Sequence, residues 1–422
     1  MWSAFGAGHD PPRASDYTRR TLPQHFDSAR DRVLVTVTGP DRIGVTATLT
    51  AILGDEGAIL HDIEQVVVQG QLTLCLLIGI PGNRDVLKEL LFAAKQLGMD
   101  LDFKPVVSPT SASTPPTEGR RYVITAIAPT LGAKHLQVLA STLAAEGANI
   151  EKIGRLSEHT LASVEIHALL PPGRDSEALK RTLLLVATDA GFDVSLQRES
   201  LYRRSKRLVV MDMDSTLIRI EVIDELARAA GVAEEVSKIT ERAMAGEMDY
   251  DESLRQRVLL LKGLDVKVLD RIAADLPLTD GAETLVRVLK RLGYRIAVIS
   301  GGFSRAADAL KRRLGLDYAY SNTLEVEAGK LTGRVVGPIV NGQRKAELLE
   351  TIAQAEGVLL DQVIAVGDGA NDLLMLERAG LGIAFHAKPK LREAADTSIS
   401  AAGLDAILYL LGISARELLE VE

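Results

Sequence analysis

Residues 209–218 read VVMDMDSTLI, and this stretch indicates how the C-terminal half of the chain is organised. An apolar run typical of a buried strand is followed at once by two aspartates, Asp212 and Asp214. An ionised carboxylate that leaves water loses much of its solvation free energy unless a partner compensates it. Two such carboxylates at a strand end therefore predict a bound cation, a shared proton or chemistry.

Two further stretches have the same form, YRIAVISGG at 294–302 and VIAVGDGAND at 363–372. Helical patterns separate these apolar runs, which is typical of an α/β fold with a Rossmann-like, doubly wound parallel sheet. Far more residues separate the first two strands than one crossover needs. We therefore expect a helical cap at about 221–285, inserted into a domain that spans 205–422.

The N-terminal half contains an internal repeat. VLVTVTGPDRIG at 33–44 aligns with YVITAIAPTLG at 122–132, and Gly57 corresponds to Gly147. Strand and helix patterns follow each copy in the same order, which predicts two βαββα-like units of α+β type. The expected organisation is a flexible tail at 1–30, the repeats at 31–107 and 121–197, and a Ser/Thr/Pro-rich linker at 108–120.

The composition excludes several classes of function. A net charge of −8 and 4% aromatic residues argue against a nucleic-acid-binding protein. No apolar run approaches the roughly 20 residues of a membrane-spanning helix, and the N-terminus has no apolar signal core. The single cysteine, Cys75, cannot form an internal disulfide. We therefore expect a cytoplasmic protein with no membrane partner.

Four groups of residues follow the apolar runs or lie near a helix start. The carboxylates suit Mg²⁺, which prefers oxygen ligands, and the serine hydroxyl, glycine amides and lysine suit phosphate oxygens. Alone, each group has a structural explanation as a turn or a surface charge, but their order at successive strand ends favours a site. The groups are Asp212 with Asp214, Ser300-Gly301-Gly302, Lys345, and Asp368 with Asp372.

These four groups resemble the motifs of the haloacid dehalogenase-like phosphatases. The resemblance implies Asp212 as nucleophile and Asp214 as general acid and base. It implies Mg²⁺ held by the Asp212 carboxylate, the Asp214 backbone carbonyl and Asp368, with Asp372 supporting these ligands. It places Ser300, Gly301, Lys345 and Asn371 around the phosphoryl group.

The resemblance extends through the whole C-terminal domain to the phosphoserine phosphatase family. It implies hydrolysis of O-phospho-L-serine to serine through an aspartyl phosphate, the last step of serine biosynthesis. Glu221 would then bind the substrate ammonium and Arg257 its carboxylate. Met244 and Tyr250 match apolar or aromatic positions that line the cap.

The repeated units resemble ACT domains, which implies a ferredoxin-like fold and amino-acid binding. GPDRIG in the first copy resembles the ligand loop, and it offers Gly39, Asp41, Arg42 and Gly44 to an effector such as serine. The second copy lacks the Asp and Arg. The resemblance also implies a homodimer, because ACT-like sheets often associate across chains.

Two alternatives remain open from the sequence. In the first, the chain is a phosphatase with the same reaction mechanism, but its substrate is another small phosphomonoester. In the second, the chain is an amino-acid sensor whose phosphatase-like half is not catalytic. The zwitterion-binding pair Glu221 and Arg257 argues against the first alternative, and the complete set of motif residues argues against the second.

Overall fold

The computed structural model describes residues 32–80, 85–106, 118–158, 160, 162–388, 391–392 and 395–421. They belong to two compact units that divide between residues 114 and 115. The expected tail at 1–30 and most of the expected linker at 108–120 lie outside the described residues. Each unit is described by itself below.

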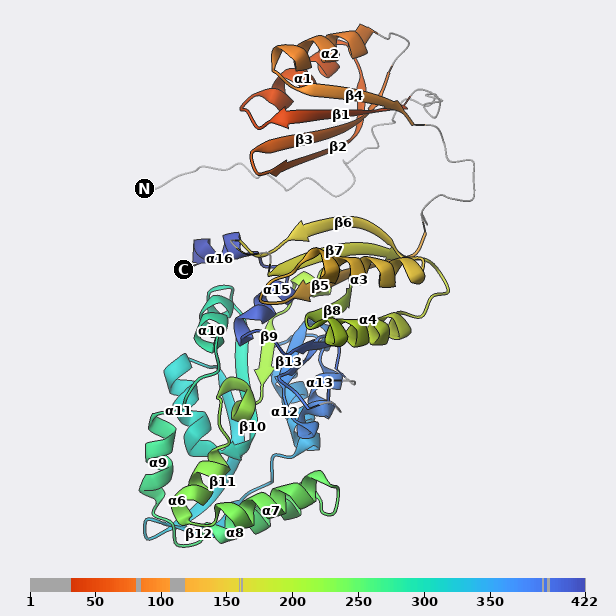
Figure 1. Ribbon diagram of the computed structural model, residues 1–422. Coiled ribbons are helices and arrows are strands. Elements are labelled where there is room, and N and C mark those ends of the chain that lie inside the picture. Colours follow the sequence, from red (N-terminus) through yellow and green to blue (C-terminus); the bar gives the residue numbers. More distant parts are fainter. Residues whose placement is uncertain are drawn as a thin grey trace, which may run out of the picture. The chain divides into compact units, whose positions relative to one another are not determined.

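The first unit is a four-stranded antiparallel sheet with two helices (Figure 1). The strands lie in the order β2-β3-β1-β4, and the buried residues alternate along β1 and β3 because one face of the sheet packs on the helices. Its elements are β1 (Arg32–Pro40), α1 (Val45–Asp55), β2 (Ile59–Val68), β3 (Gln71–Gly79), α2 (Asp85–Gln96) and β4 (Asp100–Pro105). The closing strand β4 was not predicted by the repeat pattern.

The second repeat has the same order of elements and the same strand neighbours, β8-β5-β7-β6. Its helix α4 begins with Asp175, whose side chain accepts a hydrogen bond from the Glu177 amide, and ends at Gly191 in the left-handed conformation. The elements are β5 (Arg120–Ile127), α3 (Ala133–Ala145), β6 (Asn149–Arg155), β7 (Ser163–Leu170), α4 (Ser176–Ala190) and β8 (Asp193–Arg198).

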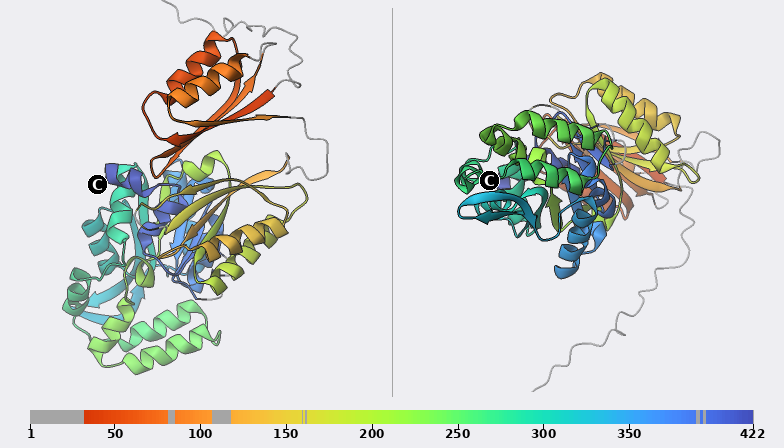
Figure 2. Two further views of the ribbon diagram at one scale, coloured as in Figure 1. Left: turned by 45° about the horizontal axis from the view of Figure 1, so that its top comes forward. Right: turned by 90° about the horizontal axis from the view of Figure 1, so that it is seen from below.

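The C-terminal domain has a central parallel sheet between two layers of helices (Figure 2). Its first strand is buried on both faces, since Val209 and Met211 pack into one hydrophobic cluster and Leu208 and Val210 into another. The strands are β9 (Leu208–Met211), β10 (Arg295–Phe303), β11 (Tyr318–Glu327), β12 (Lys330–Val336), β13 (Val363–Gly367), β14 (Gly382–Phe385) and β15 (Thr397–Ile399). The helices that accompany them are α5 (Leu201–Arg204), α10 (Ala282–Arg291), α11 (Ser304–Leu314), α12 (Gly342–Ala355), α13 (Leu373–Arg378), α15 (Ile407–Leu410) and α16 (Ala415–Val421).

Four helices form the cap between β9 and α10. They are α6 (Val222–Ala230), α7 (Ala233–Met244), α8 (Tyr250–Leu260) and α9 (Val266–Ala274). The antiparallel hairpin β11–β12 extends from the central sheet and packs against α8. The expected cap at about 221–285 thus contains these four helices, whereas α10 packs on the central sheet.

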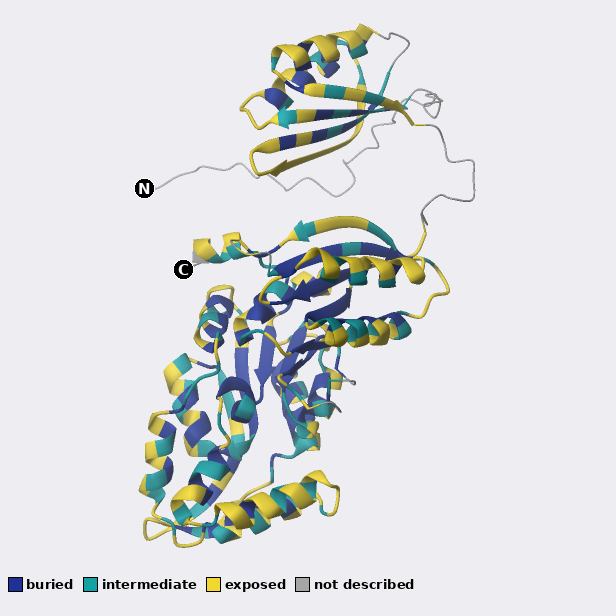
Figure 3. Ribbon diagram, viewed as in Figure 1, coloured by how far each residue is buried: buried dark blue, intermediate teal, exposed yellow. Residues whose placement is uncertain are grey.

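The sheet of the second repeat is continuous with the central sheet of the C-terminal domain. β8 pairs antiparallel with β15, giving eleven strands in the order β12-β11-β10-β9-β13-β14-β15-β8-β5-β7-β6. Its inner strands are buried, whereas the edge strand β6 is largely exposed (Figure 3). The first repeat has a four-stranded sheet of its own. No helix within the described ranges is long and apolar enough to cross a membrane.

Candidate active site

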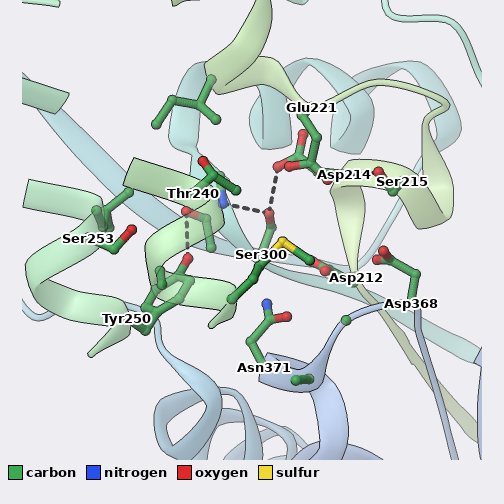
Figure 4. Close-up of a pocket in the computed structure, with 18 of the residues that line it drawn as sticks. Asp212, Asp214, Ser215, Glu221, Thr240, Tyr250, Ser253, Ser300, Asp368 and Asn371 are labelled. Atoms are coloured by element: carbon green, nitrogen blue, oxygen red, sulfur yellow. Dashed lines mark hydrogen bonds between the residues drawn. The ribbon is translucent and has the colours of Figure 1, made fainter. Parts of the chain in front are cut away.

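The site lies at the carboxyl ends of the parallel strands, where a cavity of about 890 Å³ opens between the sheet and the cap. Asp212 follows β9, Ser300 lies near the end of β10, and Asp368 follows β13. Asp212, Asp214 and Ser300 converge on one side of this cavity (Figure 4). The structure therefore brings together residues from three separate motifs of the sequence.

The turn after β9 fixes the two aspartates. The Asp212 amide donates to the Val366 carbonyl (2.9 Å), and the Asp212 carboxylate accepts from the Met213 amide (2.7 Å). Ser215 then adopts a left-handed φ of 55°, and the Asp214 carboxylate accepts from the Val222 amide (3.1 Å) at the start of α6. The first cap helix is thus tied directly to Asp214.

Lys345 lies behind the cavity and not in its lining. Its side chain is fully buried, and its Nζ contacts Asp212 Oδ1 at 2.9 Å and Asp372 Oδ1 at 2.7 Å. These two carboxylates raise the pKa of Lys345 above its ordinary value, although burial opposes them. The lysine is therefore a cation that holds the Asp212 carboxylate in position.

Three carboxylates form a cluster that fits a cation. Ligand oxygens of Asp212, Asp368 and Asp372 all lie within 4.8 Å of one another. Burial first, and repulsion by Asp372 next, raise the pKa of Asp212 and bring that of Asp368 to about 7. Lys345 offsets part of this repulsion at Asp212, and Lys345 and Lys388 offset part of it at Asp368. A hard divalent cation with oxygen ligands suits the remaining negative charge.

Asp214 has a different environment from Asp212. Burial, followed by repulsion from Glu221, raises the pKa of Asp214 to about 8. Ser300 Oγ donates to Asp214 Oδ2 over 3.4 Å. A Cβ atom at position 302 would lie 2.3 Å from the same oxygen, so glycine is required there. Burial thus raises the pKa of both aspartates, but their neighbours differ: Lys345 contacts Asp212, whereas Glu221 repels Asp214.

The Ser300-Gly301-Gly302 segment is held by neighbours on the sheet and on the cap. Ser300 Oγ accepts from the Gly302 amide (2.8 Å). The Gly301 carbonyl accepts from Asn322 Nδ2 (2.8 Å) and from Tyr250 Oη (3.3 Å). These contacts leave a serine hydroxyl and a glycine backbone at the cavity wall, where they can receive an anion.

The cap residues that the sequence singled out all line the cavity: Glu221, Met244, Tyr250 and Arg257. Glu221 Oε1 accepts from Ser215 Oγ (2.7 Å), and Arg257 Nε donates to the Ser253 carbonyl of its own helix (3.3 Å). An acid and a base thus face the same space from the cap. Asn371 lines the cavity from the β13 side.

Three further residues of the site were missed by the sequence analysis. Thr216 Oγ1 donates to Asp368 Oδ1 (3.3 Å), and Asn322 bonds both Gly301 and the Val340 amide. Lys388 lines the cavity next to the cap. Thr216 lies inside the quoted motif and could have been noticed, whereas Asn322 and Lys388 belong to no recognised pattern.

The predicted effector loop lies between β1 and α1 of the first unit. The Asp41 amide donates to the Gly70 carbonyl (2.8 Å), and Arg42 Nη1 donates to the Leu97 carbonyl (3.2 Å). Gly44 precedes α1 with a φ of 94°, and Gly39 is packed so closely that a Cβ would meet Met99 Sδ at 2.7 Å. Asp41 and Arg42 are exposed.

Comparisons with known proteins agree with this geometry. Residues 206–380 match the family of haloacid dehalogenase-like hydrolases, and residues 31–104 and 121–197 match ACT domain families. A phosphoserine phosphatase of Streptomyces coelicolor is 43% identical over 91% of this chain and 93% of its own.

Two further relatives support the same grouping. A phosphoserine phosphatase of Mycobacterium tuberculosis is 43% identical over 92% of this chain and 95% of its own. The crystal structure of a hydrolase of the same superfamily from Salmonella enterica serovar Typhi covers 69% of this chain and 98% of its own, with 32% identity and a TM-score of 0.61. With its hydrolase domain and two ACT domains, the chain belongs to the phosphoserine phosphatase family of haloacid dehalogenase-like hydrolases.

Proposed function

We propose that this chain is a Mg²⁺-dependent phosphoserine phosphatase that hydrolyses O-phospho-L-serine to serine and phosphate. One observation carries the proposal: Asp212 and Asp214 face one cavity with Ser300, and Glu221 and Arg257 line the same cavity from the cap. Phosphoserine offers a phosphate to the first group, and an ammonium and a carboxylate to the second. The similarity to phosphoserine phosphatases over most of the chain supports the substrate.

In the first step, a carboxylate oxygen of Asp212 attacks phosphorus, and the bond between phosphorus and the seryl oxygen breaks. The protonated Asp214 gives its proton to that oxygen, so serine leaves as the neutral alcohol. Lys345 and the Met213 amide hold the Asp212 carboxylate, while Ser300 and Gly301 hold the phosphoryl oxygens.

In the second step, the ionised Asp214 takes a proton from a water molecule, which attacks the phosphorus of the aspartyl phosphate. The bond to Asp212 breaks, and phosphate is released. Mg²⁺ would be held by the Asp212 and Asp368 carboxylates and the Asp214 backbone carbonyl, with Asp372 supporting them, and would offset the negative charge of carboxylates and phosphate.

Phosphate release from phosphoserine tests the proposal. We expect release with Mg²⁺ and none after EDTA treatment, with activity restored by added Mg²⁺. Asp212→Asn should form no phosphoenzyme, because an amide cannot attack phosphorus. Phosphothreonine and a sugar phosphate are tested as alternative substrates. If either is hydrolysed faster than phosphoserine, that compound and not phosphoserine is the preferred substrate.

We also propose that the first ACT domain binds an amino-acid effector, with serine as the candidate, at Gly39, Asp41, Arg42 and Gly44. The exposed Asp41 and Arg42 beside the start of α1 support this, since they offer one partner to an ammonium and one to a carboxylate. Serine titration in the full chain and in Asp41→Ala tests it. Equal inhibition of both proteins would mean simple product competition.

A homodimer is proposed through the exposed edge of the first ACT domain. β2 is an edge strand, and it exposes the large apolar side chains Ile63, Val66, Val67 and Val68. Light scattering after chromatography should give twice the chain mass for the natural protein. Val66→Lys should shift the mass toward a single chain if this edge is the interface.

A further inference from the structure

Besides Arg257 of the cap, a second basic residue, Lys388, lines the cavity. Five carboxylates line the cavity, whereas the basic residues in its lining are Arg257 and Lys388. The carboxylates are Asp212, Asp214, Glu221, Asp224 and Asp368. An anionic substrate therefore approaches a wall of mostly like charge, and each cation at the entrance matters for its entry.

Lys388 lies between the catalytic loop and the cap. Its amide donates to the Asp368 carbonyl (3.4 Å), so its backbone is attached to the loop after β13. Its Nζ is 3.7 Å from Met244 Sδ at the end of α7. The residue itself is exposed, which places the ammonium at the mouth of the cavity and not behind it, unlike Lys345.

Two short links connect Lys388 to the second ACT domain. The Lys388 carbonyl accepts from the Leu391 amide (3.0 Å) and the Arg392 amide (3.2 Å). The Arg392 guanidinium then donates to Thr188 Oγ1 on α4 (3.0 Å). Leu391 is buried and also lines the cavity, so this turn is packed against the hydrolase domain as well.

A second anchor lies further along the same segment. Asp396 pairs with Lys180 Nζ of α4 (3.2 Å) and accepts from the Gly382 amide of β14 (2.9 Å). Thr397 Oγ1 donates to Ser195 Oγ of β8 (2.6 Å) where the two sheets join. The chain on either side of β15 is thus held by α4 and β8 of the ACT domain.

We propose that Lys388 is a substrate-binding residue that attracts the anionic substrate into the cavity, and that the second ACT domain positions it through the Arg392–Thr188 contact. The inference rests on the proposed phosphatase function and adds a residue to it. The ligand chemistry is a phosphomonoester or free phosphate, because these carry the charge that the lysine would meet.

The test compares Lys388→Met with Lys388→Arg in the full chain. We expect Lys388→Met to lower kcat/KM for phosphoserine about tenfold, mainly through KM, and Lys388→Arg to stay within about twofold. The kcat/KM of the natural protein should fall with rising ionic strength more steeply than that of Lys388→Met. Lys238→Met is the control, because Lys238 pairs with Glu234 on α7 and does not line the cavity.

The positioning role is tested by Thr188→Val, which keeps the shape of the side chain and removes the acceptor for Arg392. We expect KM to rise about two- to threefold with kcat unchanged, because Lys388 is still present but its position is less well fixed. Thr182→Val is a matched control, since both threonines donate to the carbonyl four residues earlier on α4. Equal KM values for the two threonine variants would overturn this half of the proposal.

The outcomes separate this inference from the proposed function. If the natural protein hydrolyses phosphoserine and Lys388→Met has unchanged kcat/KM and salt dependence, the inference alone fails. If the natural protein does not hydrolyse phosphoserine, the proposed function fails. The Kd for inorganic phosphate then tests whether Lys388 binds the anion. A several-fold weaker Kd in Lys388→Met then supports the lysine contact, and an equal Kd overturns it.

Discussion

At the scale of residues, the site brings together carboxyl groups whose pKa values are all raised by burial but whose neighbours differ. After burial, repulsion from Glu221 raises the pKa of Asp214 further, whereas Asp212 is contacted by the cation Lys345. In the proposed mechanism, this difference in environment, and not in residue type, separates the nucleophile from the acid.

The pH dependence of the first chemical step follows from Asp214. Its pKa of about 8 lies above the ordinary value, so the acid form persists at neutral pH and is lost as pH rises through about 8. We expect kcat/KM for phosphoserine to fall about tenfold per pH unit above that point. An aryl phosphate, whose leaving group needs no proton, should show no such fall, and a parallel fall for both substrates would contradict the assignment.

The raised pKa of Asp214 also makes the free energy of unfolding depend on pH. Between the ordinary aspartate pKa and about 8, the folded chain keeps a proton on Asp214 that the unfolded chain has released. The stabilising contribution of this group is therefore present at acidic pH and is lost as pH rises toward 8.

Asn322 is a second residue with a measurable role. Its amide is 1% exposed and satisfies both the Gly301 carbonyl and the Val340 amide. We expect Asn322→Ala to lower the free energy of unfolding by about 1–3 kcal/mol and kcat/KM by at least tenfold, because the phosphate-binding turn loses its support. Gln362→Ala is the control, because it removes a hydrogen bond from Gln362 Nε2 to the Ser205 carbonyl outside the cavity. It should lower stability without lowering kcat/KM.

The sequence located most of this site at residue scale because acid pairs and glycines at strand ends form recognisable patterns. Asn322 and Lys388 were not identified from the sequence, and the reason is physical. Each is a single polar residue whose role arises only when distant strands bring it beside Gly301 or Asp368. The ion pair between Lys345 and Asp372 is another contact that no spacing could predict.

At the scale of elements, the cap helix α8 meets the phosphate-binding turn. Tyr250 begins α8 and bonds the Gly301 carbonyl, and Asp251 accepts from Asn341 Nδ2 (3.0 Å) at the start of α12. Burial raises the pKa of Tyr250 to about 12, so its hydroxyl remains a donor. The cap thus contacts the Ser300-Gly301-Gly302 turn and the helix that carries Lys345.

A compensating pair of substitutions tests this contact. In Gly301→Ala the new Cβ would lie 1.9 Å from Tyr250 Oη, and the next atom of that side chain is Cζ at 3.0 Å. We expect Gly301→Ala to lower kcat/KM at least a hundredfold, since the cap or the turn must shift by an ångström or more. Adding Tyr250→Phe should recover part of the loss, and no recovery would mean that the cap does not close on Gly301 in this way.

Elements were predictable where an apolar run or an apolar periodicity marks them. The strands around Asp212, Ser300 and Asp368 and the cap helices follow from apolar periodicity. The hairpin β11–β12 and the closing strands β4 and β8 did not, because polar and charged residues interrupt their sequences and no apolar run like that of β9 marks them. β15 has three residues, too few for any periodicity.

At the scale of the whole molecule, the second ACT domain and the hydrolase domain share one sheet and a buried ion pair. Arg203 of α5 pairs with Glu165 of β7, and both side chains are almost fully buried. Gly412 packs against the same arginine, so the pair lies between the domains. The link is also made by Gln197 Nε2, which donates to the Leu410 carbonyl (3.0 Å).

Removing one partner of this pair should destabilise both domains together. Glu165→Ala leaves the Arg203 guanidinium buried without its partner, and we expect a loss of about 3–5 kcal/mol in the free energy of unfolding. Glu151→Ala breaks the more exposed pair with Arg121 in the same ACT domain and should cost about 0–1 kcal/mol. Urea unfolding measures both, and equal losses would contradict the structural role of Arg203.

The junction between β8 and β15 has a consequence during synthesis. β8 ends at Arg198, and its neighbour β15 is complete only at Ile399, about 200 residues later. At ribosomal speeds of about 5–20 residues per second, the outer edge of β8 waits about 10–40 s for its partner. The nascent ACT domain must therefore leave the ribosome with a bare strand edge, and this interval is when the chain is most open to pairing with the wrong neighbour.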